Sequence, residues 1–209
     1  EYCEKLRQAY AGKEIYPIGF DWYWRPWGGY IPILQTYTDK PFVKGRTDTK
    51  SAAVRRTLEL MKKFYPYMPA AAAGNLGASK AFQMGTVAME IYWQTQMLRA
   101  IQAGQPAEDI EMTSLPKGTR GGTVFWSTGY MILKYGKHKQ EVANFLAEAL
   151  RSRLFYAGAI ADWKLMPFKS AYKQMKHELL DYYPPLISSL ETGEAKPIPN
   201  SGYMMAAEL

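Results

Sequence analysis

Apolar residues recur three to four positions apart along much of the chain, and this spacing is typical of amphipathic helices. The clearest case is residues 139–151, where Val142, Phe145 and Leu146 form an apolar face that we expect to be buried. The same spacing predicts helices over residues 1–10, 54–65, 79–82, 97–101 and 170–182, with a further short helix beginning at residues 184–185. We expect helices to end near Gly12, Gly85 and Gly104, because glycine is favoured just past the last helical turn.

Two of these helices have a recognisable apolar face. In the helix over residues 1–10 the apolar positions are Tyr2, Leu6 and Tyr10. In the helix over residues 54–65 they are Val54, Leu58, Met61 and Tyr65. Thr47-Asp48 offers an N-terminal cap for the second helix, and Pro66 predicts its end.

Three shorter segments have the composition of β-strands. Residues 86–92 are rich in β-branched and aromatic side chains, and residues 110–115 form a second predicted strand. Residues 130–133 are a nearly continuous apolar run, which is typical of a strand buried in a sheet. Because strands alternate with helices along the sequence, the predicted fold class is α/β.

The composition is that of a globular protein and argues against several classes of site. Of the 209 residues, 47% are hydrophobic and 22% are charged, and no apolar run reaches the ~18 residues of a membrane span. One cysteine (Cys3) and two histidines (His138 and His177) leave little for disulfides or metal binding, so we expect no metal and no cofactor. The net charge is +7, but the basic residues lie in scattered pairs, which indicates solvated faces rather than a nucleic-acid site.

No motif of a common enzyme class is present in the sequence. It lacks a Gly-Lys-Ser or Gly-Lys-Thr phosphate loop and a Gly-x-Ser-x-Gly elbow, and Cys3 has no histidine nearby. The glycine-rich loop over residues 117–122 could cradle a phosphate, although a connecting loop is the better interpretation. Asp21, Glu90 and Asp162 lie beside aromatic residues, but nothing identifies an acid/base pair among them.

Aromatic residues are unusually frequent, with 6 Trp, 16 Tyr and 8 Phe making up 14% of the chain. Six of them fall between Phe20 and Tyr30, while Trp93 follows a predicted strand and Trp126 follows the glycine-rich loop. Indole rings pack against the flat C–H faces of sugars, and neighbouring polar groups bind the hydroxyls. The alternative is that these rings fill the core, as buried tryptophan does in many small domains.

The order of several short motifs resembles that of the solute-binding proteins of ABC importers, in particular the carbohydrate type. Residues 81–89 (Ala-Phe-Gln-Met-Gly-Thr-Val-Ala-Met) resemble the family's A-F-x-x-G-x-x-A-M signature, and an aromatic residue, Trp93, follows. Further matches are a strand ending in Leu-Pro at residues 115–116, the glycine-rich loop, the helix from Lys137 and the Pro-x-Pro segment at residues 197–199. The resemblance covers essentially the whole chain. One departure is Ser127-Thr128-Gly129, where the family often has a Gly-Gly pair.

This resemblance implies a two-lobed, periplasmic-binding-protein-like fold of the Venus-flytrap type II, with the first lobe largely missing from this chain. Residues 1–122 would form an α/β segment of the C-terminal lobe, residues 123–150 would cross to the other lobe, and residues 151–209 would return. The implied partners are a small-molecule solute, a sugar in the first place, and a membrane permease. The implied location is periplasmic or extracellular, with a lipoprotein anchor as one option. Because the last residues look like an interrupted helix, we expect a fragment or a processed product.

The resemblance also implies which residues bind the solute, and it implies no catalytic residue. Trp24 or Trp27 would form an aromatic wall, and Trp93 would stack against the sugar. Trp126, Ser127 and Thr128 would lie where the chain crosses between the lobes, and Tyr203 in the late segment that lines the cleft. The polar groups expected to bind hydroxyls are those of Asp21, Arg25 and Glu90. The alternatives are a carbohydrate-active hydrolase and a binder of anionic polyol phosphates or peptides.

Overall fold

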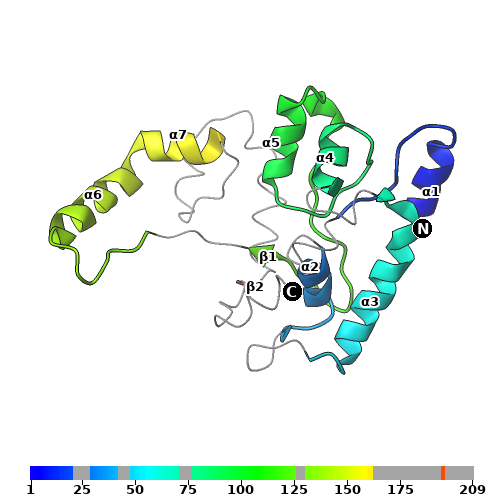
Figure 1. Ribbon diagram of the computed structural model, residues 1–209, viewed down its shortest axis with the longest axis horizontal. Helices are drawn as coiled ribbons and strands as arrows, with labels where there is room; N and C mark the ends of the chain where they lie inside the picture. Colours follow the sequence, from blue (N-terminus) through cyan, green and yellow to red (C-terminus); the bar gives the residue numbers. More distant parts are fainter. Residues whose placement is uncertain (21–28, 42–47, 71–76, 126–129, 162–193, 196–209) are drawn as a thin grey trace.

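The computed structural model describes residues 1–20, 29–41, 48–70, 77–125, 130–161 and 194–195 (Figure 1). Helices make up most of the regular structure in these ranges. They are α1 (Tyr2–Ala9), α2 (Tyr30–Gln35), α3 (Ala52–Phe64), α4 (Gly77–Gln83), α5 (Thr95–Gln102), α6 (Lys139–Arg151) and α7 (Arg153–Ala161), with 3-10 turns at Tyr65–Tyr67 and Ala107–Asp109. Strands β1 (Val124–Phe125) and β2 (Glu194–Ala195) pair in parallel. The helices predicted over residues 170–182 and from residue 184 lie outside the described residues.

Five predicted helices are present as α1, α3, α4, α5 and α6, and the last of them has the predicted bounds. The expected glycines follow their ends, with φ angles of 81° at Gly12, 70° at Gly85 and 101° at Gly104. Two helices, α2 and α7, were not predicted. Helix α2 contains a proline and follows a glycine pair, and α7 is apolar almost all round, so neither has a clear amphipathic pattern.

Helix α3 differs from its prediction in its cap and in its buried face. The hydroxyl oxygen of Ser51, not Thr47-Asp48, accepts a hydrogen bond from the backbone N–H of Val54 at 3.2 Å. The buried residues are Val54, Thr57 and Met61, whereas Leu58 and Tyr65 are exposed. The buried stripe therefore lies on the Thr57 side of the predicted one. Thr57 fits this side because its hydroxyl donates to the Ala53 carbonyl within the same helix.

Helix α1 also turns a different side inward. Cys3 is buried in the core, while Tyr2 is exposed. Adjacent helical positions are about 100° apart, so one step decides which of these two side chains meets the rest of the protein. The Tyr67 hydroxyl donates to Glu4 on the same helix at 2.9 Å, which holds α1 against the 3-10 turn after α3.

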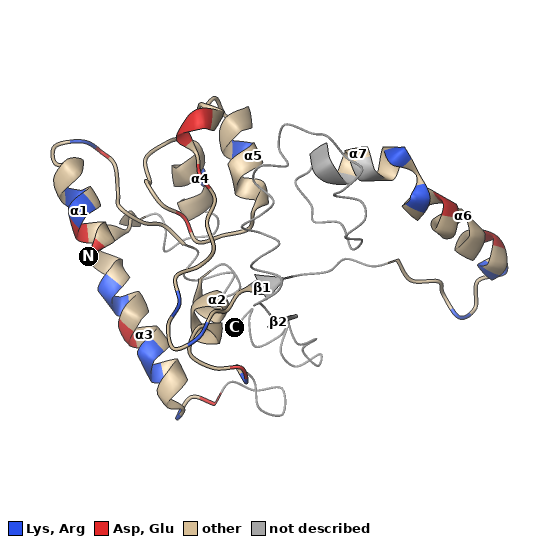
Figure 2. Ribbon diagram, turned by 180° about the vertical axis from the view of Figure 1, so that it is seen from behind, with Lys and Arg blue, Asp and Glu red and all other residues tan. Residues whose placement is uncertain are grey.

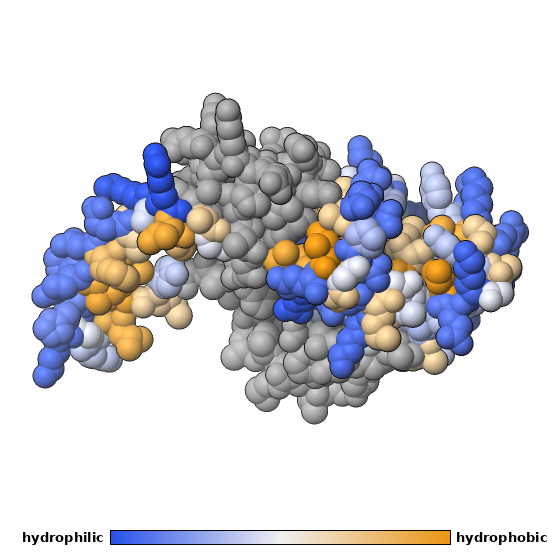
Figure 3. All heavy atoms as spheres, turned by 90° about the horizontal axis from the view of Figure 1, so that it is seen from above, coloured by the Kyte–Doolittle hydropathy of each residue, from blue (hydrophilic) through white to orange (hydrophobic). Residues whose placement is uncertain are grey.

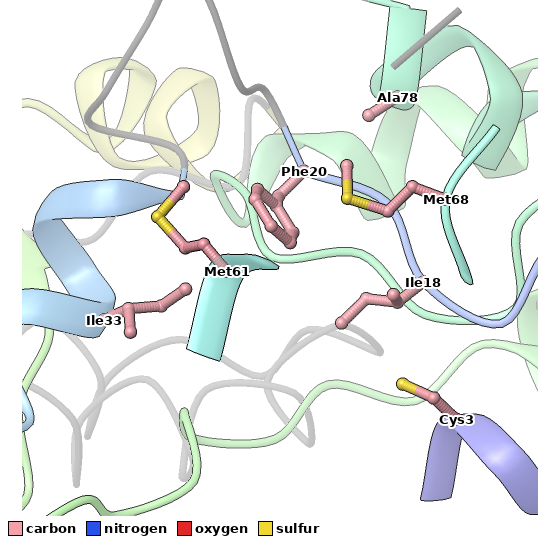
Figure 4. Close-up of a cluster of buried hydrophobic side chains, with 7 residues drawn as sticks. All are labelled: Cys3, Ile18, Phe20, Ile33, Met61, Met68 and Ala78. Carbon is pink, nitrogen blue, oxygen red and sulfur yellow. The ribbon is translucent and has the colours of Figure 1, made fainter. Parts of the chain in front are cut away.

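The main apolar core joins α1, α2, α3 and α4 around one extended segment. Its buried members are Cys3, Ile18, Phe20, Ile33, Met61, Met68 and Ala78 (Figure 4). Phe20 is fully buried and meets the Phe64 ring edge-on, with 5.9 Å between ring centroids. One member of the aromatic block over residues 20–30 is therefore a core residue, as the alternative interpretation of that block allowed.

Two extended segments, residues 16–20 and 86–91, run in parallel through the centre of this body. Single β-bridges pair Tyr16 with Val87 and Gly19 with Glu90. The predicted strand over residues 86–92 is thus an extended segment that pairs only through isolated bridges, so the prediction of a regular strand is wrong. Continuous strand structure requires an unbroken ladder of hydrogen bonds, and here the backbone pairs only at separate points.

The segment before β1 is not the predicted strand. Residues 110–115 are irregular. The glycine-rich loop that follows lies over the C-terminal end of α2, where the backbone N–H of Arg120 donates to the Thr36 carbonyl at 3.0 Å. The Arg120 side chain donates to the Thr38 carbonyl at 3.3 Å, which strengthens this contact. Residues 119–120 are thus held by hydrogen bonds to the residues just after α2, whereas residues 110–115 form no strand.

The remaining helices, α6 and α7, lie apart from the body that contains α1 to α5 (Figures 1 and 2). The predicted buried strand over residues 130–133 is an irregular segment whose four apolar side chains are exposed. The predicted inward face of α6 is wrong as well, since Val142 and Phe145 are exposed and none of the residues of α6 is buried. Apolar side chains gather on this projecting part (Figure 3). The residues of these predicted apolar faces are apolar, but no other element among the described residues buries them.

Residues of both charge signs occur on α1, α3 and α6, as Figure 2 shows. On α3 the basic residues of the last turn, Lys62 and Lys63, stand where the helix dipole favours positive charge. This distribution fits the interpretation of the basic pairs as solvated helix faces. No helix among the described residues is long and apolar enough to cross a membrane.

Candidate functional site

The candidate site is built on the carboxyl ends of the two parallel segments. The backbone N–H of Gly19 donates to the Met89 carbonyl at 2.8 Å, and the N–H of Ile91 donates to the Gly19 carbonyl at 3.0 Å. The two segments therefore end side by side. One continues into the aromatic residues from position 21, and the other continues into Tyr92 and Trp93. Ligands of open α/β proteins bind beyond this end of parallel strands.

Trp93 lies just after the second segment and two positions before α5. Its side chain is half-buried, and its ring meets that of Tyr92 edge-on, with 6.3 Å between centroids and an interplanar angle of 81°. Aromatic rings favour this edge-on arrangement, so the contact with Tyr92 restrains the orientation of the indole. Since the ring is only half-buried, part of its surface remains open for a ligand.

Glu90 lies three residues before Trp93 and is fixed by a buried serine. The Ser79 hydroxyl on α4 donates to one carboxylate oxygen of Glu90 at 2.9 Å. Ser79 is buried and Glu90 is half-buried. A carboxylate held in this way is a pre-positioned hydrogen-bond acceptor, which is the property that recognition of a hydroxyl requires.

The structure thus places two of the predicted binding residues, Glu90 and Trp93, close together in one segment. The other predicted residues lie outside the described ranges: Asp21, Trp24, Arg25, Trp27, Trp126, Ser127, Thr128 and Tyr203. Their backbone neighbours are described in two cases, because Phe20 precedes Asp21 and β1 precedes Trp126.

One buried polar residue on α2, which contacts β1, escaped the sequence analysis. Gln35, the last residue of α2, is a fully buried polar side chain with 1% of its surface exposed. The glycine-rich loop packs against the backbone of this residue, since a Cβ atom on Gly122 would come within 2.5 Å of the Gln35 backbone carbonyl oxygen. The sequence could have indicated this residue, because a glutamine follows three aliphatic residues that are buried in α2. That inference requires α2 to be recognised as a helix first.

The titratable groups of the described residues are scattered rather than gathered at one metal site. No group of three or more His, Cys, Asp and Glu side chains among these residues could hold a metal ion. Burial raises the pKa of the Cys3 thiol, which keeps it protonated and unreactive near neutral pH. His138 lies 3.5 Å from Glu141 on the exposed first turn of α6.

The loop over residues 117–122 serves as a connection to α2. Besides the Arg120 contacts, the Thr119 hydroxyl is 3.4 Å from the Thr36 carbonyl. These donors approach carbonyl oxygens at the end of a helix, a region of negative partial charge. This arrangement agrees with the connecting-loop interpretation and not with a phosphate cradle.

Comparison with known protein families gives a match over most of the chain. Residues 1–179 match the family model described as bacterial extracellular solute-binding protein. No curated protein and no solved structure matches the chain. The match covers the paired segments, Glu90, Trp93 and the projecting helices, and it supports the periplasmic-binding-protein-like fold in its general form. It also supports a generally non-catalytic role in which a small-molecule solute is bound outside the cytoplasm for an ABC transporter permease. The chain belongs to the bacterial extracellular solute-binding proteins.

Proposed function

We propose that the solute is a carbohydrate or a related polar molecule, held between two lobes before delivery to the permease. The observation that carries this proposal is the pairing of a half-buried indole and a fixed carboxylate, Trp93 and Glu90, in one short segment. A sugar ring has a flat apolar face and a rim of hydroxyls, so it needs both kinds of group within a few ångströms.

The other parallel segment, residues 16–20, supports the same proposal through the sequence that follows it. After Phe20 come Asp21, Trp24, Arg25 and Trp27, which combine aromatic and hydrogen-bonding side chains. The Gly19 hydrogen bonds bring the end of this segment beside residues 89–91. We therefore assign these four residues to the same site. Trp126, Ser127, Thr128 and Tyr203 are proposed as further contacts on the strength of the family resemblance.

The division into lobes is part of the proposal. Residues 1–122 and 151–209 are assigned to one lobe, and residues 123–150 to a segment that crosses to the other. Support comes from α6, which has no buried residue and stands apart from the body with Val142 and Phe145 exposed. A face of this kind is expected where a helix packs against another part of a two-lobed protein.

Isothermal titration calorimetry and thermal shift with glucose, maltose, maltotriose, trehalose and cellobiose test the proposal. We expect saturable binding of at least one sugar, with a higher melting temperature in its presence. Inorganic phosphate and glycerol 3-phosphate serve as the comparison for an anion binder. Binding of these anions in place of sugars would contradict the proposal, and sustained release of reducing sugar from a glycoside would favour the hydrolase alternative.

A further inference from the structure

The side chain of Gln35 presents an unusual combination of burial and polarity. It is 1% exposed, and among the residues that the structure describes neither its amide nitrogen Nε2 nor its carbonyl oxygen Oε1 has a hydrogen-bond partner. A carboxamide has two N–H donors and an oxygen with two lone pairs. Leaving all of them buried and unpaired costs free energy, so such groups in native proteins call for an explanation.

The surroundings of Gln35 on α2 make an aliphatic residue the expected choice for stability. The preceding positions Ile31, Ile33 and Leu34 are all apolar and almost fully buried. Ile33 belongs to the main core. Gln35 is two positions further on, about 200° round the helix, so it lies on the other side of α2 from that core.

The other side of α2 meets the chain that leads into β1. Gly122 is buried against the Gln35 backbone, where a Cβ atom would come within 2.5 Å of the carbonyl oxygen and 2.6 Å of the carbonyl carbon. Two residues later β1 begins, and α2 contacts β1 directly (Figure 1). The residues next after β1 are Trp126, Ser127 and Thr128, which the proposed function assigns to the solute. Gln35 is therefore adjacent in space to the approach to that segment.

We infer that the Gln35 carboxamide is a hydrogen-bonding group for the solute, an inference that rests on the proposed function. A carboxamide both donates and accepts, which matches a hydroxyl group, since a hydroxyl also does both. It carries no charge, so it complements a neutral hydroxyl-bearing molecule rather than an anion. The unpaired amide then lowers the free energy of unfolding of the unbound protein, and it gains its hydrogen-bond partners when the solute binds.

The test compares two buried glutamines. Gln35→Met removes the unpaired amide at similar volume. Gln96→Met is the matched control, because Gln96 on α5 is 3% exposed but accepts a hydrogen bond from the Gln83 amide at 2.8 Å. Urea denaturation without sugar and calorimetry with the sugar that binds the wild type most tightly are measured for both variants in the full-length protein.

We expect opposite results for the two substitutions. Gln35→Met should raise the urea midpoint and weaken sugar binding at least 10-fold, about 1.4 kcal/mol. Gln96→Met should lower the midpoint, because it leaves the Gln83 amide without its acceptor, and should retain wild-type affinity.

Three outcomes would overturn the inference. Unchanged sugar affinity in Gln35→Met would mean that the amide binds a structural water or nothing. A lowered urea midpoint, or loss of the folded state, in that variant would mean that the amide has a structural partner. If the wild type binds none of the sugars, the proposed function fails first and the inference fails with it, which separates this result from the other two.

Discussion

At the scale of single residues, the candidate site consists of side chains with restrained positions and incomplete burial. Trp93 is half-buried beside the Tyr92 ring, and Glu90 is held by the Ser79 hydroxyl. Residues that serve only the core look different here, as the fully buried Phe20 does. Phe20 is therefore a core residue, whereas the partial exposure of Trp93 is compatible with the binding role that we propose for it.

Trp93→Ala should weaken sugar binding by roughly 10- to 100-fold, because stacking on an aromatic ring contributes on the order of 1–3 kcal/mol. The unfolding midpoint should fall only modestly, since the ring is not part of the main core. Calorimetry measures the affinity, and Trp93→Phe is the control that retains an aromatic face. Unchanged affinity, or an unfolded variant, would make Trp93 a structural residue and move the aromatic wall to Trp24, Trp27 and Trp126.

A second prediction at this scale concerns pH. The Arg7 guanidinium donates to Glu4 at 2.7 Å and the Tyr67 hydroxyl donates at 2.9 Å, and these bonds hold the pKa of the Glu4 carboxyl below its ordinary value of 4.5. A carboxyl whose pKa is lower in the folded state stabilises the fold above its unfolded pKa. This stabilisation is lost as the pH falls through the folded pKa.

Wild type should therefore be more stable than Glu4→Gln at pH 7, and the difference should shrink as the pH falls below about 4.5. Urea denaturation of both proteins at a series of pH values measures this. Glu1→Gln is the control, because it removes only an exposed ion pair with Lys5 and should change stability little at any pH. A constant difference between wild type and Glu4→Gln across the series would show that the Glu4 contacts do not depend on its charge.

At the scale of elements, five helices (α1, α3, α4, α5 and α6) formed where periodicity predicted them, but their environments differ. Met61 of α3 is 3% exposed in the main core, whereas Phe145 of α6 is 68% exposed, although both lie on predicted apolar faces. The difference arises because α3 packs on α2, while α6 contacts chiefly α7 among the described elements. An amphipathic pattern states which face can be buried, and a neighbouring element decides whether it is.

Met61→Ala in the 209-residue chain should lower the free energy of unfolding by about 2–5 kcal/mol, because it opens a cavity in the core. Phe145→Ala in the same chain should change it by less than about 0.5 kcal/mol, as expected for an exposed side chain. Chemical denaturation of the two variants makes the comparison. A loss in Phe145→Ala as large as that in Met61→Ala would mean that the α6 face is packed after all.

At the scale of the whole molecule, the body with the two parallel segments and the projecting α6 and α7 are joined through an exposed connection. Residues 130–141 are all exposed, and those before α6 carry Lys134 and Lys137 in irregular structure. Leu154 and Phe145 on the projecting part are exposed. Apolar surface gathers on this part, as Figure 3 shows. This arrangement agrees with the proposal that residues 123–150 cross from one lobe to another.

Limited proteolysis examines this connection. Trypsin should cut first after Lys134 or Lys137, because proteases require an accessible and irregular backbone. Lys62 and Lys63, within α3, should be cut much later and provide the internal control. Mass spectrometry of early time points identifies the sites. Early cleavage within α3, with the connection intact, would contradict the arrangement described here.

The sequence by itself determined the features that depend on neighbours along the chain. It was sufficient to predict the bounds of α6 and the glycines after α1, α4 and α5. It was also sufficient to identify the ordered motifs of the solute-binding family. Helix periodicity and glycine's left-handed conformations are local properties, so a single chain read in order contains them.

Only the tertiary structure decided which of these features meet. It turned Cys3 inward instead of Tyr2, paired residues 16–20 with residues 86–91, left the α6 face exposed and buried the Gln35 side chain. Each of these outcomes depends on contacts between residues far apart in the sequence. Burial and pairing are settled by which distant surfaces come together, and no window of neighbouring residues carries that information.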